Sequence, residues 1–205
     1  MKIVAIVDYG MGNLDSVYRA VEECGGHPVV THLESDIQRA SFVILPGVGS
    51  FAAGVSKIRK LGLDEILTEQ VLEKQIPFLG ICLGMQLLAT KGREGAETSG
   101  LDWIQGEVVR LKPSSPHERI PHVGWNEVLF ARNSSLFEGI DSGRDFYFVH
   151  SYHLSCQSED IVIATTPYCG GFVSAVCKGY IHGVQFHPEK SQKPGFQVLK
   201  NFLRL

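Results

Sequence analysis

Apolar positions in the first ninety residues alternate between short continuous runs and helical spacings. The continuous runs are rich in β-branched residues, which is typical of buried strands, and they cover residues 2–7, 28–33, 42–45 and 78–81. The helical spacings repeat apolar residues three and four positions apart, and they cover residues 14–23, 51–60, 63–74 and 83–89. This alternation predicts a mostly parallel sheet flanked by helices on both faces.

The second half of the chain has a different pattern. Short strand-like segments, separated by Gly, Pro, Asn and Ser, cover residues 107–111, 126–130, 146–149, 161–165, 174–178 and 181–186. Residues 178–180 are expected to turn a hairpin, residues 112–122 to form a long loop, and residues 194–205 to form a closing helix. The expectation is one α/β domain over residues 1–205, with an antiparallel extension and a strand order that the pattern does not fix.

Composition narrows the class of protein. The chain has 205 residues, of which 44% are hydrophobic and 20% are charged, which suits a single compact domain. With a formal net charge of −3 and scattered Lys and Arg, a nucleic-acid surface is not expected. No apolar run approaches the ~20 residues of a membrane span. Asp8 interrupts the apolar start, so we interpret residues 2–7 as a strand and not as a signal peptide.

Cysteine and histidine usage argues against disulfides and metals. The five cysteines form no CxxC pair, and an odd number in this arrangement fits the reducing cytoplasm. His150, His153, His182 and His187 lack an Asp or Cys placed to complete a cation site. No metal and no cofactor are therefore expected.

One cysteine lies in a pattern that carries chemistry. The segment Gly80–Gly84 places Cys82 between an apolar run and a helical spacing, as in the elbow on which α/β enzymes present a nucleophile. Its glycines matter because a side chain at either flank would collide with neighbouring backbone. The start of the following helix favours a thiolate and supplies N–H groups for an oxyanion. Alone, the pattern fits a buried structural cysteine equally well.

A thiol nucleophile needs a base and a group that orients the base. His187 and Glu189 lie two residues apart at the end of the last apolar run. The histidine can serve as the base, and the glutamate can orient it. The loop Pro46–Gly49 also follows an apolar run, so it should lie at the same sheet edge as the elbow, where its amides can stabilise an oxyanion. A phosphate-binding loop is less well supported there, because no Lys-Ser/Thr follows.

These segments together resemble the class I glutamine amidotransferases. The resemblance rests on the elbow at 80–86, the loop at 46–49 and the segment at 186–189. It narrows to the glutaminase subunits of imidazole glycerol phosphate synthase through DYGMGNL (8–14), PHVGWN (121–126) and FYFVHSY (146–152). The resemblance spans nearly the whole chain.

The resemblance implies a role for each matching position. The substrate would be L-glutamine, and Cys82 would form a glutamyl thioester with it. His187 and Glu189 would complete the catalytic triad. The oxyanion hole would be formed by amides at Val48, Gly49 and Leu83. The glutamine pocket would be formed by Gln86, Glu94, Ser151, Tyr152 and His153. A partner would be faced by Asn13, Trp125 and Lys190.

The partner that the resemblance implies is a (β/α)8 cyclase subunit, bound as a heterodimer. It would receive ammonia and combine it with a phosphoribulosyl-formimino aminoimidazole carboxamide nucleotide in histidine biosynthesis. Members of this kind are nearly idle alone, because the loop amide points away from the site until the partner and its ligand bind.

Three other interpretations remain open at this point. A paralogous glutaminase would use the same pocket to feed a sugar amidotransferase in surface-polysaccharide biosynthesis. A cysteine hydrolase or peptidase would keep the elbow but would not need the segments around Asn13 and Trp125. A regulatory protein without activity would not need all three triad residues.

Overall fold

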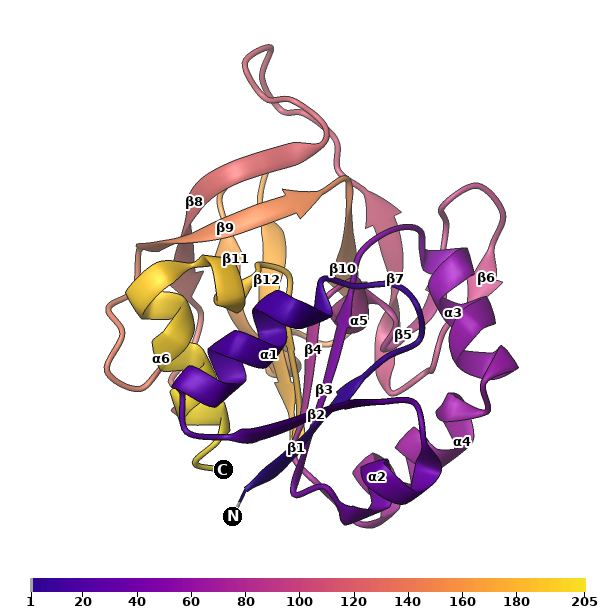
Figure 1. The fold of residues 1–205 in the computed structure, drawn as a ribbon. Coiled ribbons are helices and arrows are strands. Elements are labelled where there is room, and N and C mark those ends of the chain that lie inside the picture. Colours follow the sequence, from indigo (N-terminus) through magenta and orange to yellow (C-terminus); the bar gives the residue numbers. More distant parts are fainter. Residues whose placement is uncertain (1) are drawn as a thin grey trace.

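The computed structural model describes residues 2–205, and a nine-stranded sheet forms its centre (Figure 1). The strand order is β2 (His27–Thr31), β1 (Ile3–Val7), β3 (Phe42–Gly47), β4 (Phe78–Cys82), β13 (Ile181–Val184), β12 (Phe172–Lys178), β11 (Val162–Thr166), β8 (His122–Phe130) and β9 (Arg144–His150). Neighbours from β2 to β13 are parallel, and those from β13 to β9 are antiparallel. The predicted parallel sheet with an antiparallel extension is confirmed.

Helices cover both faces of the parallel strands (Figure 1). One face packs on α1 (Leu14–Glu23) and α6 (Gln192–Phe202), and the other on α2 (Glu34–Arg39), α3 (Phe51–Lys60) and α4 (Leu63–Thr68). Alternate residues of β1 enter the two cores, because successive side chains of a strand point to opposite faces. Val4 and Ile6 pack in the core with α1 and α6, whereas Ala5 and Val7 pack in the other. This is why the strand is apolar at every position.

A second, smaller sheet, which contacts β12 and the helix that follows Cys82, was not predicted. Its order is β10 (Tyr152–Cys156), β7 (Ile104–Arg110), β5 (Ala89–Gly92) and β6 (Thr98–Ser99). The helix expected over residues 83–89 is wrong beyond Gln86, where α5 (Leu83–Gln86) ends. The carbonyls of residues 87–89 accept hydrogen bonds from Leu101, Asp102 and Trp103, so the chain turns into β5.

Two further differences concern helices. The predicted strand at 28–33 ends at Thr31, whose hydroxyl accepts from the Leu33 amide and donates to Asp36 in the unpredicted helix α2. The predicted helix at 63–74 is α4 followed by one π-helical turn (Glu69–Glu73). The hairpin at 178–180 is confirmed, with Lys178 paired to Ile181.

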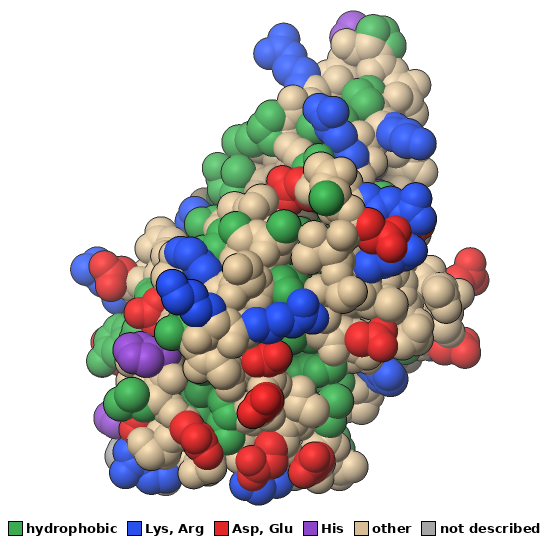
Figure 2. Space-filling model, turned by 90° about the vertical axis from the view of Figure 1, so that its right-hand side faces the viewer, with side chains coloured by type: hydrophobic (Ala, Val, Ile, Leu, Met, Phe, Trp, Pro, Cys, Tyr) green, Lys and Arg blue, Asp and Glu red, His purple; other side chains and the backbone are tan. Residues whose placement is uncertain are grey.

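The predicted long loop before β8 projects from the molecule (Figure 1). The Glu118 carboxylate holds it by accepting hydrogen bonds from the Ser114, Ser115 and Cys169 amides. Figure 2 shows Lys and Arg side chains spread from the top to the bottom of one face of the molecule, whereas most of the Asp and Glu side chains on it lie in its lower half. Across residues 2–205, no helix combines the length and hydropathy needed to span a membrane.

Candidate active site

Cys82 stands at a sharp turn where β4 ends and α5 begins. Its φ of 54° lies in the left-handed region, which a residue with a side chain enters only when the surrounding structure holds it there. A Cβ added at Gly84 would lie 1.7 Å from the Leu45 carbonyl oxygen, and one at Gly80 would lie 2.7 Å from the Gly84 backbone. Glycine is therefore required on both sides of the cysteine, as expected for an elbow.

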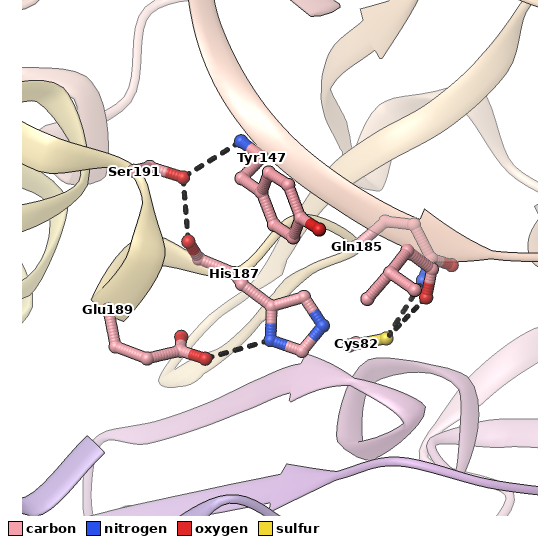
Figure 3. Close-up of polar contacts among 7 residues, drawn as sticks. Cys82, Tyr147, Gln185, His187, Glu189 and Ser191 are labelled. Carbon is pink, nitrogen blue, oxygen red and sulfur yellow. Dashed lines mark hydrogen bonds and ion pairs between the residues drawn. The ribbon is translucent and has the colours of Figure 1, made fainter. Parts of the chain in front are cut away.

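The structure brings His187 and Glu189 to this turn (Figure 3). The imidazole Nδ1 lies 2.8 Å from Oε1 of Glu189, and both side chains are buried. The ring lies between Glu189 and Cys82, with Nε2 on the cysteine side. Within the described chain Nε2 has no hydrogen-bond partner. Because Glu189 accepts the proton on Nδ1, Nε2 is the nitrogen available to exchange a proton with Cys82.

The charge state of His187 reflects two opposing effects. Burial by itself lowers the pKa of an imidazole, because it removes water from the charged form. Here the adjacent Cys82 sulfur and the Glu189 carboxylate outweigh burial and raise the pKa of His187. The arrangement therefore favours an imidazolium facing a sulfur, which is the protonation state that a thiolate nucleophile needs.

The backbone around His187 is fixed from two sides (Figure 3). Ser191 Oγ donates to the His187 carbonyl at 2.6 Å and accepts from the Tyr147 amide at 3.0 Å. The His187 amide donates to the Tyr147 carbonyl at 2.9 Å. The imidazole is thus held by β9 and by the turn that precedes α6.

A pocket of about 260 Å³ opens beside Cys82. It contains most of the positions that the resemblance implied, and it is lined by Val48, Gly49, Cys82, Leu83, Gln86, Glu94, Val149, His150, Ser151 and Tyr152. Glu94 is held at its wall because one carboxylate oxygen accepts from the Phe51 amide at 2.7 Å. His153 does not line this pocket; its ring centroid lies 5.9 Å from that of Phe172.

The glycine loop after β3 lies directly beside the elbow, and its glycines have close neighbours. An added Cβ would lie 2.1 Å from the Tyr9 hydroxyl at Gly47 and 2.6 Å from Met11 at Gly49. Gly49 also has a φ of +114°, which disfavours any other residue. The segment after β1 therefore packs on the loop that lines the pocket.

Gln185 is a site residue that the sequence did not reveal. Its amide Nε2 donates to Cys82 Sγ at 3.6 Å, and its Oε1 accepts from Gln86 Nε2 at 3.0 Å (Figure 3 shows the first contact). Gln185 is fully buried. Its place two residues before His187, in the same strand-end segment, was the only available signal.

The three residues expected to face a partner are exposed, and two of them, Asn13 and Lys190, follow the carboxyl ends of β1 and β13, at the edge where Cys82 ends β4. Trp125 and Lys190 each lie near the Tyr147 ring: the indole centroid is 5.9 Å from the phenol centroid, and Lys190 Nζ is also 5.9 Å from it. Asn13 precedes α1, which contacts the turn containing Lys190. Among residues 2–205, no group of three or more His, Cys, Asp or Glu side chains could hold a metal ion.

Comparison with protein families and curated proteins gives concordant matches. The model of the family "Glutamine amidotransferase class-I" matches residues 5–205. The imidazole glycerol phosphate synthase subunit HisH of Moorella thermoacetica is 47% identical over 202 residues, covering 98% of this chain and 94% of the relative. Subunit HisH 1 of Campylobacter jejuni is 44% identical over 203 residues, covering 99% and 100% respectively.

Solved structures share the fold at lower identity. The PurLQS structure from Thermotoga maritima has a TM-score of 0.73 at 20% identity and covers 100% of this chain and 99% of its own. The glutaminase domain of CTPS from Trypanosoma brucei has a TM-score of 0.70 at 16% identity, covering 100% and 92%. At this level of identity, the two structures show only that the fold is shared.

Proposed function

The chain belongs to the glutamine amidotransferase class-I family and, within it, to the HisH glutaminase subunits of imidazole glycerol phosphate synthase, and we propose that Cys82, His187 and Glu189 carry its reaction. The observation that carries this proposal is their geometry. A strained cysteine that lines one small pocket faces a buried His–Glu pair. This geometry also argues against a regulatory protein without activity.

In the first half of the reaction, Cys82 Sγ attacks the side-chain amide carbon of glutamine. The amide oxygen becomes an oxyanion, which the amides at Leu83 and in the Val48–Gly49 loop stabilise. His187 Nε2 takes the thiol proton and delivers it to the amide nitrogen, so that ammonia leaves and a glutamyl thioester remains. Glu189 keeps Nδ1 protonated and stabilises the imidazolium.

The second half returns the enzyme to its starting state. Water, deprotonated by His187, attacks the thioester carbon, and the same amides stabilise the second oxyanion. The C–S bond breaks, glutamate leaves, and the proton returns from His187 to Cys82. One water is consumed for each glutamine, and the products are glutamate and ammonia.

The pocket lining gives glutamine a defined orientation. Glu94 presents a carboxylate that can accept from the substrate ammonium group, while its other oxygen is anchored on the Phe51 amide. Gln86, Ser151 and Tyr152 add further polar groups to the lining. His153 is not part of this pocket proposal, because its ring lies outside the lining.

The ammonia has to reach a second active site before water protonates it. We assign this step to a (β/α)8 cyclase subunit that binds over Asn13, Trp125 and Lys190, at the same edge as the pocket. The names of the relatives favour the histidine pathway over a polysaccharide pathway. The five free cysteines fit a reducing cytoplasm.

Co-expression of this chain with a (β/α)8 cyclase subunit tests the proposal. We expect a 1:1 complex that hydrolyses glutamine only slowly by itself and much faster once the cyclase's phosphoribulosyl-formimino aminoimidazole carboxamide nucleotide is added. A chain that cleaves peptides briskly without a partner, or a complex that never consumes glutamine, would refute it.

A further inference from the structure

An unbroken series of hydrogen bonds runs from Asn126, next to the exposed Trp125, to the nucleophile. It begins on β8, crosses to the end of β9, and reaches Cys82 through two buried amides. We call it the amide–histidine chain, and its members are Asn126, His122, His150, the Tyr152 carbonyl, Gln86, Gln185 and Cys82.

The outer half of this chain contains two buried histidines. Asn126 Nδ2 lies 3.3 Å from His122 Nε2, and His122 Nδ1 lies 3.0 Å from His150 Nε2. His150 Nδ1 lies 2.8 Å from the Tyr152 carbonyl oxygen. The exposed fraction is 4% for His122 and 6% for His150, so both imidazole rings are shielded from water.

The donor and the acceptor of each hydrogen bond in this outer half can be assigned from the Tyr152 carbonyl at one end and Asn126 at the other. The Tyr152 carbonyl only accepts, so His150 carries its proton on Nδ1 and accepts at Nε2. His122 must then donate from Nδ1 and accept at Nε2, and Asn126 is the donor that meets it. Burial lowers the pKa of both histidines, to about 4 for His122 and about 3 for His150, so each carries one proton at neutral pH.

The inner half of the chain reaches the reacting sulfur. Gln86 Nε2 donates to the same Tyr152 carbonyl at 2.8 Å and to Gln185 Oε1 at 3.0 Å. This sets the orientation of the Gln185 amide, whose nitrogen then faces Cys82 Sγ at 3.6 Å. Each donor and acceptor role in the chain is thereby fixed by its neighbours.

Aromatic packing keeps His122 in place. Its ring is stacked between Tyr168, at 4.1 Å between centroids, and Phe148, at 5.0 Å. The triad chemistry uses neither His122 nor His150. The structure nevertheless keeps two imidazoles buried here, at the desolvation cost that buried polar groups carry.

We propose that His122 and His150 are positioning residues for the glutaminase reaction: they orient the Tyr152 carbonyl, and through Gln86 and Gln185 they fix the donor that faces the Cys82 sulfur. This inference rests on the proposed glutaminase function. It also gives the exposed strand β8 a direct physical connection to the nucleophile, because Asn126 adjoins Trp125 on that strand.

The test uses two substitutions at His122. His122→Phe keeps the stacked ring but removes both bonds and leaves His150 Nε2 unpaired, whereas His122→Asn restores a donor at the position of Nδ1. His182→Phe is the matched control, since His182 is buried on β13 and its ring contacts Cys177 and Phe202 outside this chain.

In the complex with the cyclase and its nucleotide, we expect His122→Phe to lower kcat for glutamine about tenfold, with KM changed less than about twofold. His122→Asn should recover most of the loss, and His182→Phe should leave kcat unchanged. In the full chain without the cyclase, iodoacetamide should alkylate Cys82 more slowly in His122→Phe than in wild type. The rate should be unchanged in the other variants.

Several results would overturn the proposal. Equal kcat in wild type and His122→Phe would do so, as would an equal loss in His182→Phe or no recovery in His122→Asn. Should His122→Phe not fold, Asn126→Ala removes only the outermost donor, and an unchanged kcat in that variant would also overturn it. A wild-type complex without glutaminase activity would instead refute the proposed function, while the alkylation rates would still test the positioning.

Discussion

Gly47 and Cys82 are direct partners across the parallel strands β3 and β4. The proposed oxyanion loop and the proposed nucleophile therefore leave the sheet side by side, at the carboxyl ends of adjacent strands. His187 reaches the same edge because β13, which precedes it, is the parallel neighbour of β4 on the other side. Three segments that are far apart in sequence thus meet through strand order alone.

The first prediction concerns the elbow glycines. Gly84→Ala places a methyl group 1.7 Å from the Leu45 carbonyl oxygen, which is backbone in a buried strand and cannot rotate out of the way as a side chain would. We expect the free energy of unfolding to fall by more than about 2 kcal/mol. Gly12→Ala is the control, since its added Cβ would meet neighbours only at 3.5 Å or beyond, and it should change stability by less than about 0.5 kcal/mol. Urea unfolding of both variants decides the matter; equal stabilities would contradict the elbow geometry.

The second prediction concerns the group that orients the base. Glu189→Gln keeps the size of the side chain but removes the charge that stabilises the His187 imidazolium. In the activated complex we expect kcat for glutamine to fall by at least about 100-fold, within the range of general acid–base catalysis. Synthesis from added ammonium salts should be unaffected. A loss of less than about threefold would show that Glu189 is not the orienting group.

The third prediction concerns labelling. Burial raises the pKa of the Cys24, Cys156, Cys169 and Cys177 thiols, so they are poor nucleophiles at neutral pH. A glutamine-mimicking electrophile should therefore modify Cys82 alone. Mass spectrometry of the intact chain and of its peptides checks this. Comparable modification of any other cysteine would contradict the assignment of Cys82 as the activated thiol.

The fourth prediction concerns pH and stability. The pKa of His122 is lowered from 6.5 to about 4, and that of His150 from 6.5 to about 3, by burial. Between these values and about pH 6.5 the unfolded chain binds more protons than the folded chain. The part of the stability that depends on these two histidines is therefore complete above about pH 6.5 and is lost as the pH falls through this window.

Each buried histidine contributes a slope of up to about 1.4 kcal/mol per pH unit. Urea unfolding between about pH 7 and pH 5 measures this slope. His122→Phe should flatten it, whereas substitution of the exposed His117 should leave it unchanged. An equal slope in wild type and His122→Phe would mean that His122 does not titrate on unfolding in this window.

Sequence patterns predicted which segments form the candidate site because each segment lies at the end of an apolar strand. Cys82 ends β4, the Pro46–Gly49 loop begins in the last two residues of β3, and His187 follows β13. The carboxyl ends of these parallel strands lie at one edge of the sheet. The two glycines around Cys82 were informative because their requirement is local and steric. Such features need no knowledge of the rest of the fold.

What the sequence did not reveal depends on long-range pairing. The helix after Cys82 stops at Gln86 because the amides of residues 101–104 donate hydrogen bonds to the carbonyls of residues 87–89. No local sequence pattern predicts these long-range hydrogen bonds. Gln185 becomes a site residue only because Gln86 orients its amide toward the sulfur. His122 and His150 pair across β8 and β9, whose register the pattern alone does not specify.

The most direct test of the central claim compares two nitrogen sources in one complex. Cys82→Ala, assembled with the cyclase, should lose all synthesis from glutamine while it retains wild-type synthesis from added ammonium salts. That result would place Cys82 in ammonia release and not in the structure of the complex. Persistent glutamine-dependent synthesis in Cys82→Ala, or loss of the ammonium-dependent reaction as well, would contradict the account.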